Sequence, residues 1–177
     1  MISFSHKHIS IAGPGDVSEI TSLLNSAYRG ESSKQGWTTE AHLIAGDLRT
    51  DEAGLEEVMN LPNSILLKYQ DEQQQIIGCV NLQQHEDKIY LGMLSVAPQL
   101  QASGLGRALL QAAEEYAGQL GCQSIYMTVF TARTELIDWY KRNGYKDTGE
   151  RKPFIENAVT GRPLQPLTFL VLEKVLA

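Results

Sequence analysis

The sequence predicts a mixed α/β fold, in which a mostly antiparallel sheet of about seven strands is flanked by helices and contains a central βαβ unit. The run Lys88–Val96 is apolar on both faces, which is typical of a strand in the middle of a sheet. A helical pattern follows it, with apolar residues at Leu105, Leu109, Ala112, Tyr116 and Leu120. The strand-like run Gln123–Phe130 comes next. This order predicts two parallel strands joined by a right-handed crossover.

The residues before this unit predict alternating strands and helices. A glycine-rich turn at residues 13–15 precedes a helix whose apolar stripe includes Ile20, Leu23, Leu24 and Ala27. The expected elements are a strand at 8–12, a helix at 16–28, a short helix at 39–44, a helix at 51–59 and strands at 64–69 and 75–82. We expect the last two strands to form an antiparallel meander with Lys88–Val96.

After the βαβ unit, the pattern predicts one more helix and two closing strands. Gly121 is placed to end the first helix in a left-handed conformation, and Gly144 is placed to end a second helix over residues 132–143. Residues 151–166 hold several glycines and prolines, which is typical of a loop. A last strand is expected at residues 167–176.

The turn Gln101–Arg107, between the central strand and its helix, predicts an anion site. Gly104 and Gly106 have no Cβ, so main-chain N–H groups at the helix start can converge on a phosphate or pyrophosphate. Arg107 adds positive charge and Gln101 a neutral polar group. The spacing of this turn matches neither the dinucleotide-binding fingerprint nor the phosphate loop of NTPases. The alternative is that the two glycines only shape the loop.

Two motifs together resemble those of the GNAT superfamily of acyl-CoA-dependent N-acetyltransferases. The first is Gln101-x-x-Gly104-x-Gly106 after Leu94-Ser-Val-Ala-Pro98, and the second is Trp139-Tyr-Lys-Arg-Asn-Gly-Tyr145. The resemblance implies a single N-acetyltransferase domain over residues 1–177 with acetyl-CoA as co-substrate. It implies that the turn holds the CoA pyrophosphate and that the preceding strand pairs with the pantetheine arm. The implied contacts are Leu94, Ser95, Val96, Gln101, Ala102, Ser103, Gly104, Leu105, Gly106 and Arg107.

One position departs from the family pattern. Where many members carry an asparagine that contacts pantetheine, this chain has Arg133. We include Arg133 among the expected CoA contacts, but its forked donors also suit a phosphate or an acceptor carboxylate. A third alternative is a solvated residue near the helix start.

Acetyl transfer to an amine needs a proton for the departing thiolate, and Tyr140 resembles the family's general acid. A phenol has an ordinary pKa of about 10, so it stays protonated at neutral pH. The alternative is that Tyr140 is an ordinary packing residue of an amphipathic helix. The general base is left open, because the central strand has no internal carboxylate. The candidates are Glu31, Asp47, His85 and Glu86.

The segment Tyr28–Trp37 combines aromatic residues with both charge signs. The resemblance implies that this region lines the acceptor site, where Arg29 would bind a carboxylate, Glu31 an ammonium group, and Trp37 would complete the wall. An ordinary surface loop is the alternative. Three functions follow: acetylation of a small-molecule primary amine, which leads; acetylation of protein N-termini or lysines; and a non-catalytic acyl-CoA-binding module.

Composition and net charge indicate which classes of binding partner to expect. The chain has 177 residues, 42% of them hydrophobic, and a net charge of −6, which argues against nucleic acid and favours cationic amines. Because no run is long enough to span a bilayer and the first residues lack a signal-peptide core, we expect a cytoplasmic protein without a membrane partner. A homodimer is left open.

The cysteines and histidines predict neither a disulfide nor a metal site. Cys79 and Cys122 have no CxxC spacing and are expected to be free thiols. His6 and His8 lack cysteine or carboxylate partners at ligand spacing, so we expect no metal.

Overall fold

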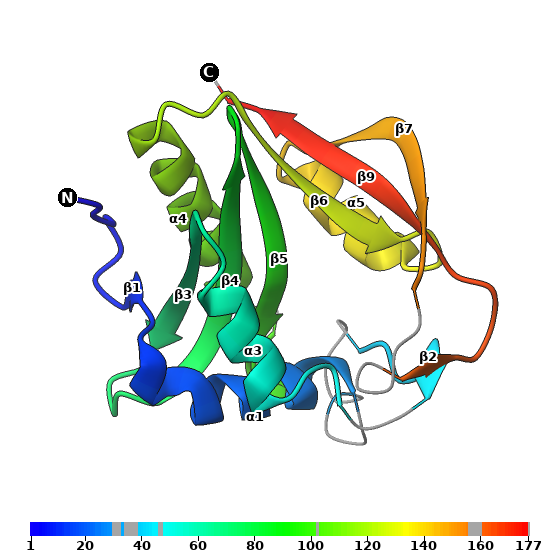
Figure 1. The fold of residues 1–177 in the computed structure, drawn as a ribbon, viewed down its shortest axis with the longest axis horizontal. Helices are drawn as coiled ribbons and strands as arrows, with labels where there is room; N and C mark the ends of the chain where they lie inside the picture. The colour runs from blue at the N-terminus through cyan, green and yellow to red at the C-terminus, as the bar shows by residue number, and fades with distance from the viewer. Residues whose placement is uncertain (30–32, 34–38, 46–47, 102, 156–160, 177) are drawn as a thin grey trace.

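The computed structural model describes residues 1–29, 33, 39–45, 48–101, 103–155 and 161–176. Its main sheet has seven strands in the order β1-β3-β4-β5-β6-β9-β7 (Figure 1). Their bounds are β1 Ile9–Ile11, β3 Ser64–Gln70, β4 Ile76–His85, β5 Lys88–Val96, β6 Ser124–Phe130, β7 Lys146–Pro153 and β9 Thr168–Val175. Neighbouring strands are antiparallel except β5 and β6, which are parallel. The predicted fold class is therefore confirmed, with β5 at the centre.

Helices cover both faces of the sheet. They are α1 Val17–Tyr28, α3 Glu52–Met59, α4 Leu105–Gln119 and α5 Thr134–Arg142, with 3₁₀ turns η1 Pro14–Asp16 and η2 Pro98–Leu100. The apolar sides of α1 and α3 pack on one face, and those of α4 and α5 pack on the other (Figure 1). Alternate strand residues divide between these cores, since Leu66 joins the first and Leu67 the second. The predicted helix ends are confirmed, because Gly121 and Gly144 have φ of +73° and +99°.

The prediction of a short helix at residues 39–44 is wrong. Residues 41–43 form a turn, and β2 (Ile44–Ala45) pairs antiparallel with β8 (Arg162–Pro163). Leu43 and Ile44 are buried against Phe130, so contacts with distant segments decide this backbone conformation. The loop predicted at residues 151–166 also differs from the structure, because β7 continues to Pro153 along β9 and Arg162–Pro163 form β8.

The central strands separate at one end. The β5–β6 ladder runs from Lys88 only as far as Tyr90, and the strands then diverge (Figure 1). On its other side, β5 has a bulge in which Met93 and Leu94 lie opposite Val80. Met93 takes a φ of +55°, which is uncommon for a residue other than glycine. The separation leaves main-chain groups of β5 without a strand partner on the β6 side, next to the turn that leads to α4.

Candidate active site

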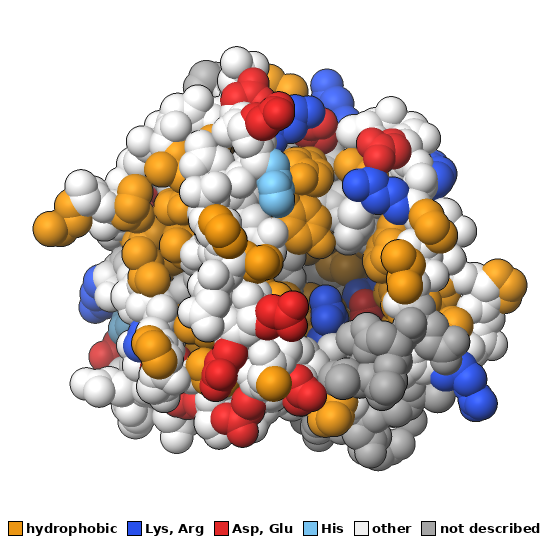
Figure 2. Space-filling model, viewed as in Figure 1, with side chains coloured by type: hydrophobic (Ala, Val, Ile, Leu, Met, Phe, Trp, Pro, Cys, Tyr) orange, Lys and Arg blue, Asp and Glu red, His pale blue; other side chains and the backbone are white. Residues whose placement is uncertain are grey.

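Two cavities meet where β5 and β6 separate. One, which we call the splay cavity, has a volume of about 330 Å³ and lies between residues 90–94 of β5 and residues 127–130 of β6. The other, the turn cavity, has a volume of about 200 Å³ and lies between the end of β5, the turn 101–107 and α5. Tyr28, Leu94, Leu136 and Tyr140 line both. Figure 2 shows the molecule hollowed between these strands, with hydrophobic side chains along the walls and basic ones at the lower edge.

The turn cavity gathers most of the predicted CoA contacts. It is lined by Leu94, Ser95, Val96, Gln101, Gly104, Gly106 and Arg107. Leu105 packs instead against the main core, Ser103 is exposed with its hydroxyl donating to the Leu100 carbonyl, and Ala102 lies outside the described residues. The structure thus brings the end of β5 and the glycine turn into one hollow.

The two glycines of the turn have different structural roles. Gly104 caps α4 with a φ of +90°, and a Cβ there would point into open space. A Cβ on Gly106 would lie 3.3 Å from the Trp139 ring, so this glycine lets α5 pack against the start of α4. The first turn of α4 has no acidic residue and no capping side chain, so its N–H groups and positive dipole end suit a phosphate. These features fit the pyrophosphate of CoA.

Tyr140 projects from α5 between the two cavities. Its ring is 5% exposed and packs edge-on against Trp139 and Tyr145, with centroids 5.0 and 5.8 Å away. Its hydroxyl makes no hydrogen bond to any residue that the structure describes. Burial raises the pKa of Tyr140 well above its ordinary value, with a further contribution from Tyr28. The phenol therefore holds its proton and has a hydrogen to donate, although both packing and catalysis are compatible with its position.

Tyr28 is a site residue that the motifs did not reveal. It is the last residue of α1, it lines both cavities, and its hydroxyl donates to the main-chain carbonyl of Leu94 in the β5 bulge. Burial raises the pKa of Tyr28 to about 12. The contact ties α1 to the point where the two cavities meet. Its only sequence signal is its place at the start of the segment Tyr28–Trp37.

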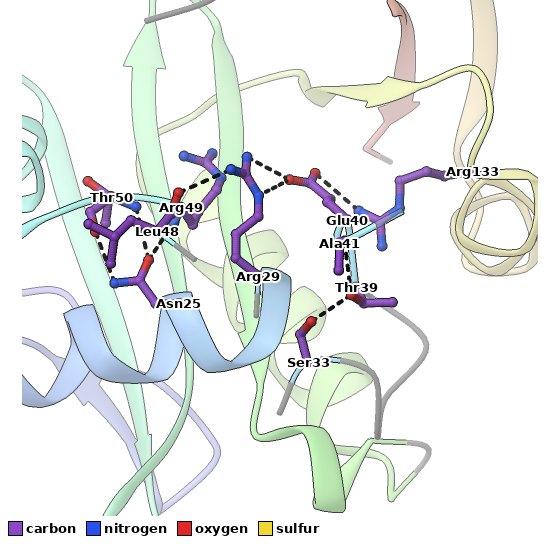
Figure 3. A network of polar contacts seen from close by, with 10 residues as sticks. All are labelled: Asn25, Arg29, Ser33, Thr39, Glu40, Ala41, Leu48, Arg49, Thr50 and Arg133. Carbon is purple, nitrogen blue, oxygen red and sulfur yellow. Dashed lines mark hydrogen bonds and ion pairs between the residues drawn. The ribbon is translucent and has the colours of Figure 1, made fainter. Parts of the chain in front are cut away.

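A buried ionic network lines the splay cavity, and Figure 3 shows its residues. Arg29 donates from Nε and Nη2 to Glu40 Oε1 at 3.2 and 3.1 Å, and from Nη1 to the Leu48 carbonyl at 3.0 Å. Arg133 Nη1 lies 3.4 Å from Glu40 Oε2. All three side chains are buried, and burying charges requires such pairing. The network joins the end of α1 to the start of α5.

This network bears on the predicted acceptor residues. Arg29 does line the splay cavity, but its Nε, Nη1 and Nη2 atoms already donate to Glu40 and Leu48. Glu31 and Trp37 lie outside the described residues. Arg133 lines the splay cavity and is not among the residues that line the turn cavity.

Of the four candidates for the general base, the two that the structure describes line neither cavity. His85 ends β4 and Glu86 lies in the turn before β5, whereas Glu31 and Asp47 lie outside the described residues. Glu40 is the one carboxylate among the described residues lining the cavities, and both of its oxygens face arginines. Both oxygens of Glu40 are therefore already engaged by guanidinium donors.

The two cysteines are free thiols, as predicted, and both are buried. Cys79 is fully buried, and burial raises the pKa of its thiol to about 12; burial also raises the pKa of Cys122. Because the thiolate is the reactive species, we expect neither thiol of the folded protein to react appreciably with a disulfide reagent at pH 8. Unfolding in guanidinium should release both. Rapid labelling of either thiol in the native protein would contradict this assignment.

In the part of the chain that the structure describes, no helix is both long and apolar enough to cross a bilayer. The same residues contain no group of three or more His, Cys, Asp or Glu side chains that could hold a metal ion.

The fold and the two joined cavities define the class of protein. Solved N-acetyltransferases share this fold. The sequence model of the acetyltransferase (GNAT) family matches residues 18–145, and the chain belongs to this family of N-acetyltransferases. The family uses acetyl-CoA or another acyl-CoA as donor. No curated protein sequence matches the chain significantly.

Several solved structures share the fold at low sequence identity. The ribosomal-protein-S18-alanine N-acetyltransferase of Escherichia coli has a TM-score of 0.71 and 14% identity, over 96% of this chain and 93% of that one. A GNAT-family acetyltransferase of Staphylococcus aureus has a TM-score of 0.68 and 16% identity, over 96% and 98%. The spermidine/spermine N-acetyltransferase of Vibrio cholerae has a TM-score of 0.65 and 19% identity, over 94% and 91%. The first and the third are named for different acceptors, so the shared fold leaves the acceptor of this chain open.

Proposed function

We propose that this protein transfers the acetyl group of acetyl-CoA to the primary amine of a small molecule, by direct attack on the thioester. The single observation that carries the proposal is the meeting of the two cavities at Tyr140. The turn cavity offers a helix start and glycine turn suited to phosphates, and the splay cavity offers a separate, partly enclosed space for an acceptor. Tyr140 lines both, so one hydroxyl can reach the atoms that change bonds.

The reaction assigns a role to each part of the site. The amine nitrogen bonds to the thioester carbonyl carbon, the carbon–sulfur bond breaks, the amine loses a proton and the thiolate gains one. We assign the proton donor to Tyr140 and stabilisation of the carbonyl oxygen to main-chain N–H groups of residues 94–96. We assign the amine's proton to solvent water, because the one carboxylate lining the cavities in the described part of the chain is ion-paired.

The proposed CoA contacts are the residues of the turn cavity. Main-chain amides of the turn and the start of α4 would hold the pyrophosphate, with Arg107 adding charge, and the open edge of β5 from Leu94 to Val96 would pair with the pantetheine arm. Gln101 Nε2 donates to the Val96 carbonyl at 2.9 Å, which fixes the turn to the end of β5. The domain that performs the reaction is proposed to span residues 1–177.

Binding of the donor can be measured without an acceptor. Acetyl-CoA at about a hundred times its dissociation constant should add roughly 2.7 kcal/mol to the free energy of unfolding. For a chain of this length that corresponds to a rise in melting temperature of roughly 5–10 °C. The rise should depend on acetyl-CoA concentration, and pantetheine without the nucleotide should give much less. A melting temperature unchanged by saturating acetyl-CoA would contradict the proposal.

Turnover separates the three candidate functions. CoA release, measured with a thiol reagent, should accelerate when a small amine is added and stay slow with peptides. Acceleration by peptides alone would favour the protein acetyltransferase. Donor binding without release in either panel would favour the non-catalytic module. Because we expect both protein thiols to be unreactive, the assay should have a low background.

A further inference from the structure

The described residues that line the splay cavity carry a net positive charge, although the chain as a whole carries a net charge of −6. Its described lining includes three arginines (Arg29, Arg49 and Arg133) and one acidic residue, Glu40. No described lysine, histidine or aspartate lines it. The described wall therefore has a surplus of two positive charges in a partly enclosed space, where charges interact more strongly than in bulk water. A cationic acceptor such as a polyamine would meet repulsion there.

Arg133 has a buried donor without a partner. Its side chain is 6% exposed, Nη1 faces Glu40, and Nη2 makes no hydrogen bond to any described residue. Leaving a charged buried donor unsatisfied is costly, and such groups are rare in folded proteins. Arg133 lines the splay cavity, so an acceptor molecule that brings an oxygen anion to Nη2 would complete its hydrogen bonding.

Arg49 places a second cation on the same side of the cavity. Its guanidinium carbon lies 5.7 Å from the centre of the Tyr28 ring, and that of Arg133 lies 6.0 Å from the same ring. Among the described residues Arg49 has no ion-pair partner, and Figure 3 shows its side chain pointing toward the Arg29–Glu40 pair. The pKa of Arg29 is lowered, mainly by burial, and the like charge of Arg49 lowers it further. An anion near Tyr28 would relieve this repulsion.

The position of Tyr28 sets the spacing of the acceptor. Its ring lies beside both arginines, and its hydroxyl bonds to the Leu94 carbonyl, where the two cavities meet. An anionic group held by the arginines is thus separated from the transfer point by little more than one side chain. Three phenylalanines, Phe130, Phe154 and Phe169, also line the cavity, and the rings of Phe130 and Phe169 stack with centroids 4.3 Å apart. This wall suits an apolar group.

We propose that the acceptor is a small amine that also carries an anionic group, a carboxylate or a phosphate-like group, close to the amine, together with an apolar body. This inference rests on the proposed function and specifies its substrate class. The anion lies between Arg133 and Arg49, the amine lies toward Tyr140 and Leu94, and the apolar body lies against the phenylalanines. Guanidinium groups recognise carboxylates and phosphates through paired hydrogen bonds, which gives the preference its strength.

Matched amines test this preference. The panel is phenylalanine, phenylalaninamide, 2-phenylethylamine, 1-amino-2-phenylethylphosphonate and spermidine, scored by kcat/KM for CoA release. We expect either phenylalanine or the phosphonate to exceed the amide by roughly 10- to 100-fold, the scale of charge-assisted hydrogen bonds. The carboxylate and phosphonate arms identify which anion fits. Spermidine should be the poorest acceptor.

Variants link the preference to the arginines. Arg133→Gln and Arg49→Gln keep a polar side chain but remove the charge, so the ratio of anionic amine to amide should fall to within a few-fold of one. Arg142→Gln is the matched control, because Arg142 is exposed on α5 and lines neither cavity; it should keep the ratio. A purely structural role of Arg133 would lower the rates with all acceptors together and leave the ratio unchanged.

Each outcome decides the inference. If the wild-type protein acetylates phenylalaninamide with the same kcat/KM as the anionic amines, the inference is overturned while the proposed function stands. If acetyl-CoA neither binds nor is turned over, the two fall together. If acetyl-CoA binds but no panel amine is acetylated, thermal shifts in the presence of CoA decide: stabilisation by the anionic amines alone supports the inference, and its absence overturns it.

Discussion

Replacing Tyr140 by phenylalanine should lower the rate of acetyl transfer by roughly 10²-fold or more, the usual scale for a lost acid catalyst. The substitution keeps the ring and its edge-on contacts with Trp139 and Tyr145. It removes the one hydroxyl that lines both cavities and has no hydrogen bond to a described residue. Acetyl-CoA affinity and the melting temperature should change little. Single-turnover CoA release measures the chemical step directly.

Tyr145→Phe is the control for this prediction. The Tyr145 hydroxyl is buried without a partner in the described structure, so its removal should be neutral or slightly stabilising and should leave turnover near the parental value. If Tyr140→Phe keeps more than about a third of the single-turnover rate, the expected effect of a lost acid is absent and Tyr140 is a packing residue.

The pH dependence gives an independent check on Tyr140. Because its pKa is raised in the folded protein, Tyr140 stays protonated as pH increases past the ordinary phenol value of about 10. The rate should therefore not decline between pH 7 and 10 through loss of this proton. A basic limb in that range that disappears in Tyr140→Phe would show that Tyr140 titrates there, against the pKa direction found.

Replacing Gly104 by valine should abolish the stabilisation of the protein by acetyl-CoA. The backbone at Gly104 has a φ of +90°, and imposing valine there costs about 1–3 kcal/mol or changes the turn. A side chain would also occupy the open space beside the turn, where the phosphate of the proposed donor would approach the backbone. The melting temperature without ligand should fall modestly, and the expected rise of roughly 5–10 °C with saturating acetyl-CoA should vanish.

Two further variants define what this result means. Gly118→Val lies on the same helix, has open space around its Cβ and lines neither cavity, so the acetyl-CoA shift should be retained. Gly106→Val would press on Trp139, so it should lower stability without ligand as well as binding. If Gly104→Val folds and still shows the parental shift with acetyl-CoA, the turn does not hold the donor.

Much of the fold could be predicted because its elements have local causes. The strand Lys88–Val96 was predicted with its observed bounds from an apolar run. Helix α4 followed from apolar periodicity, and the ends of α4 and α5 followed from glycines that take positive φ. The helix predicted at residues 39–44 was wrong for the opposite reason. Ile44 pairs with β8, and the side chains of Leu43 and Ile44 pack on Phe130. A local sequence pattern does not indicate contacts with residues so distant in the chain.

The candidate site divides in the same way. The sequence by itself determined the family, the glycine turn and the tyrosine of α5, because these depend on residue types at fixed spacing along neighbouring elements. Only the tertiary structure decided that β5 and β6 separate after Tyr90, that Tyr28 reaches Leu94, and that Glu40 joins Arg29 to Arg133. Those contacts join segments far apart in the chain, and they form only when burial of the sheet faces brings the segments together, since buried charges and donors must then find partners.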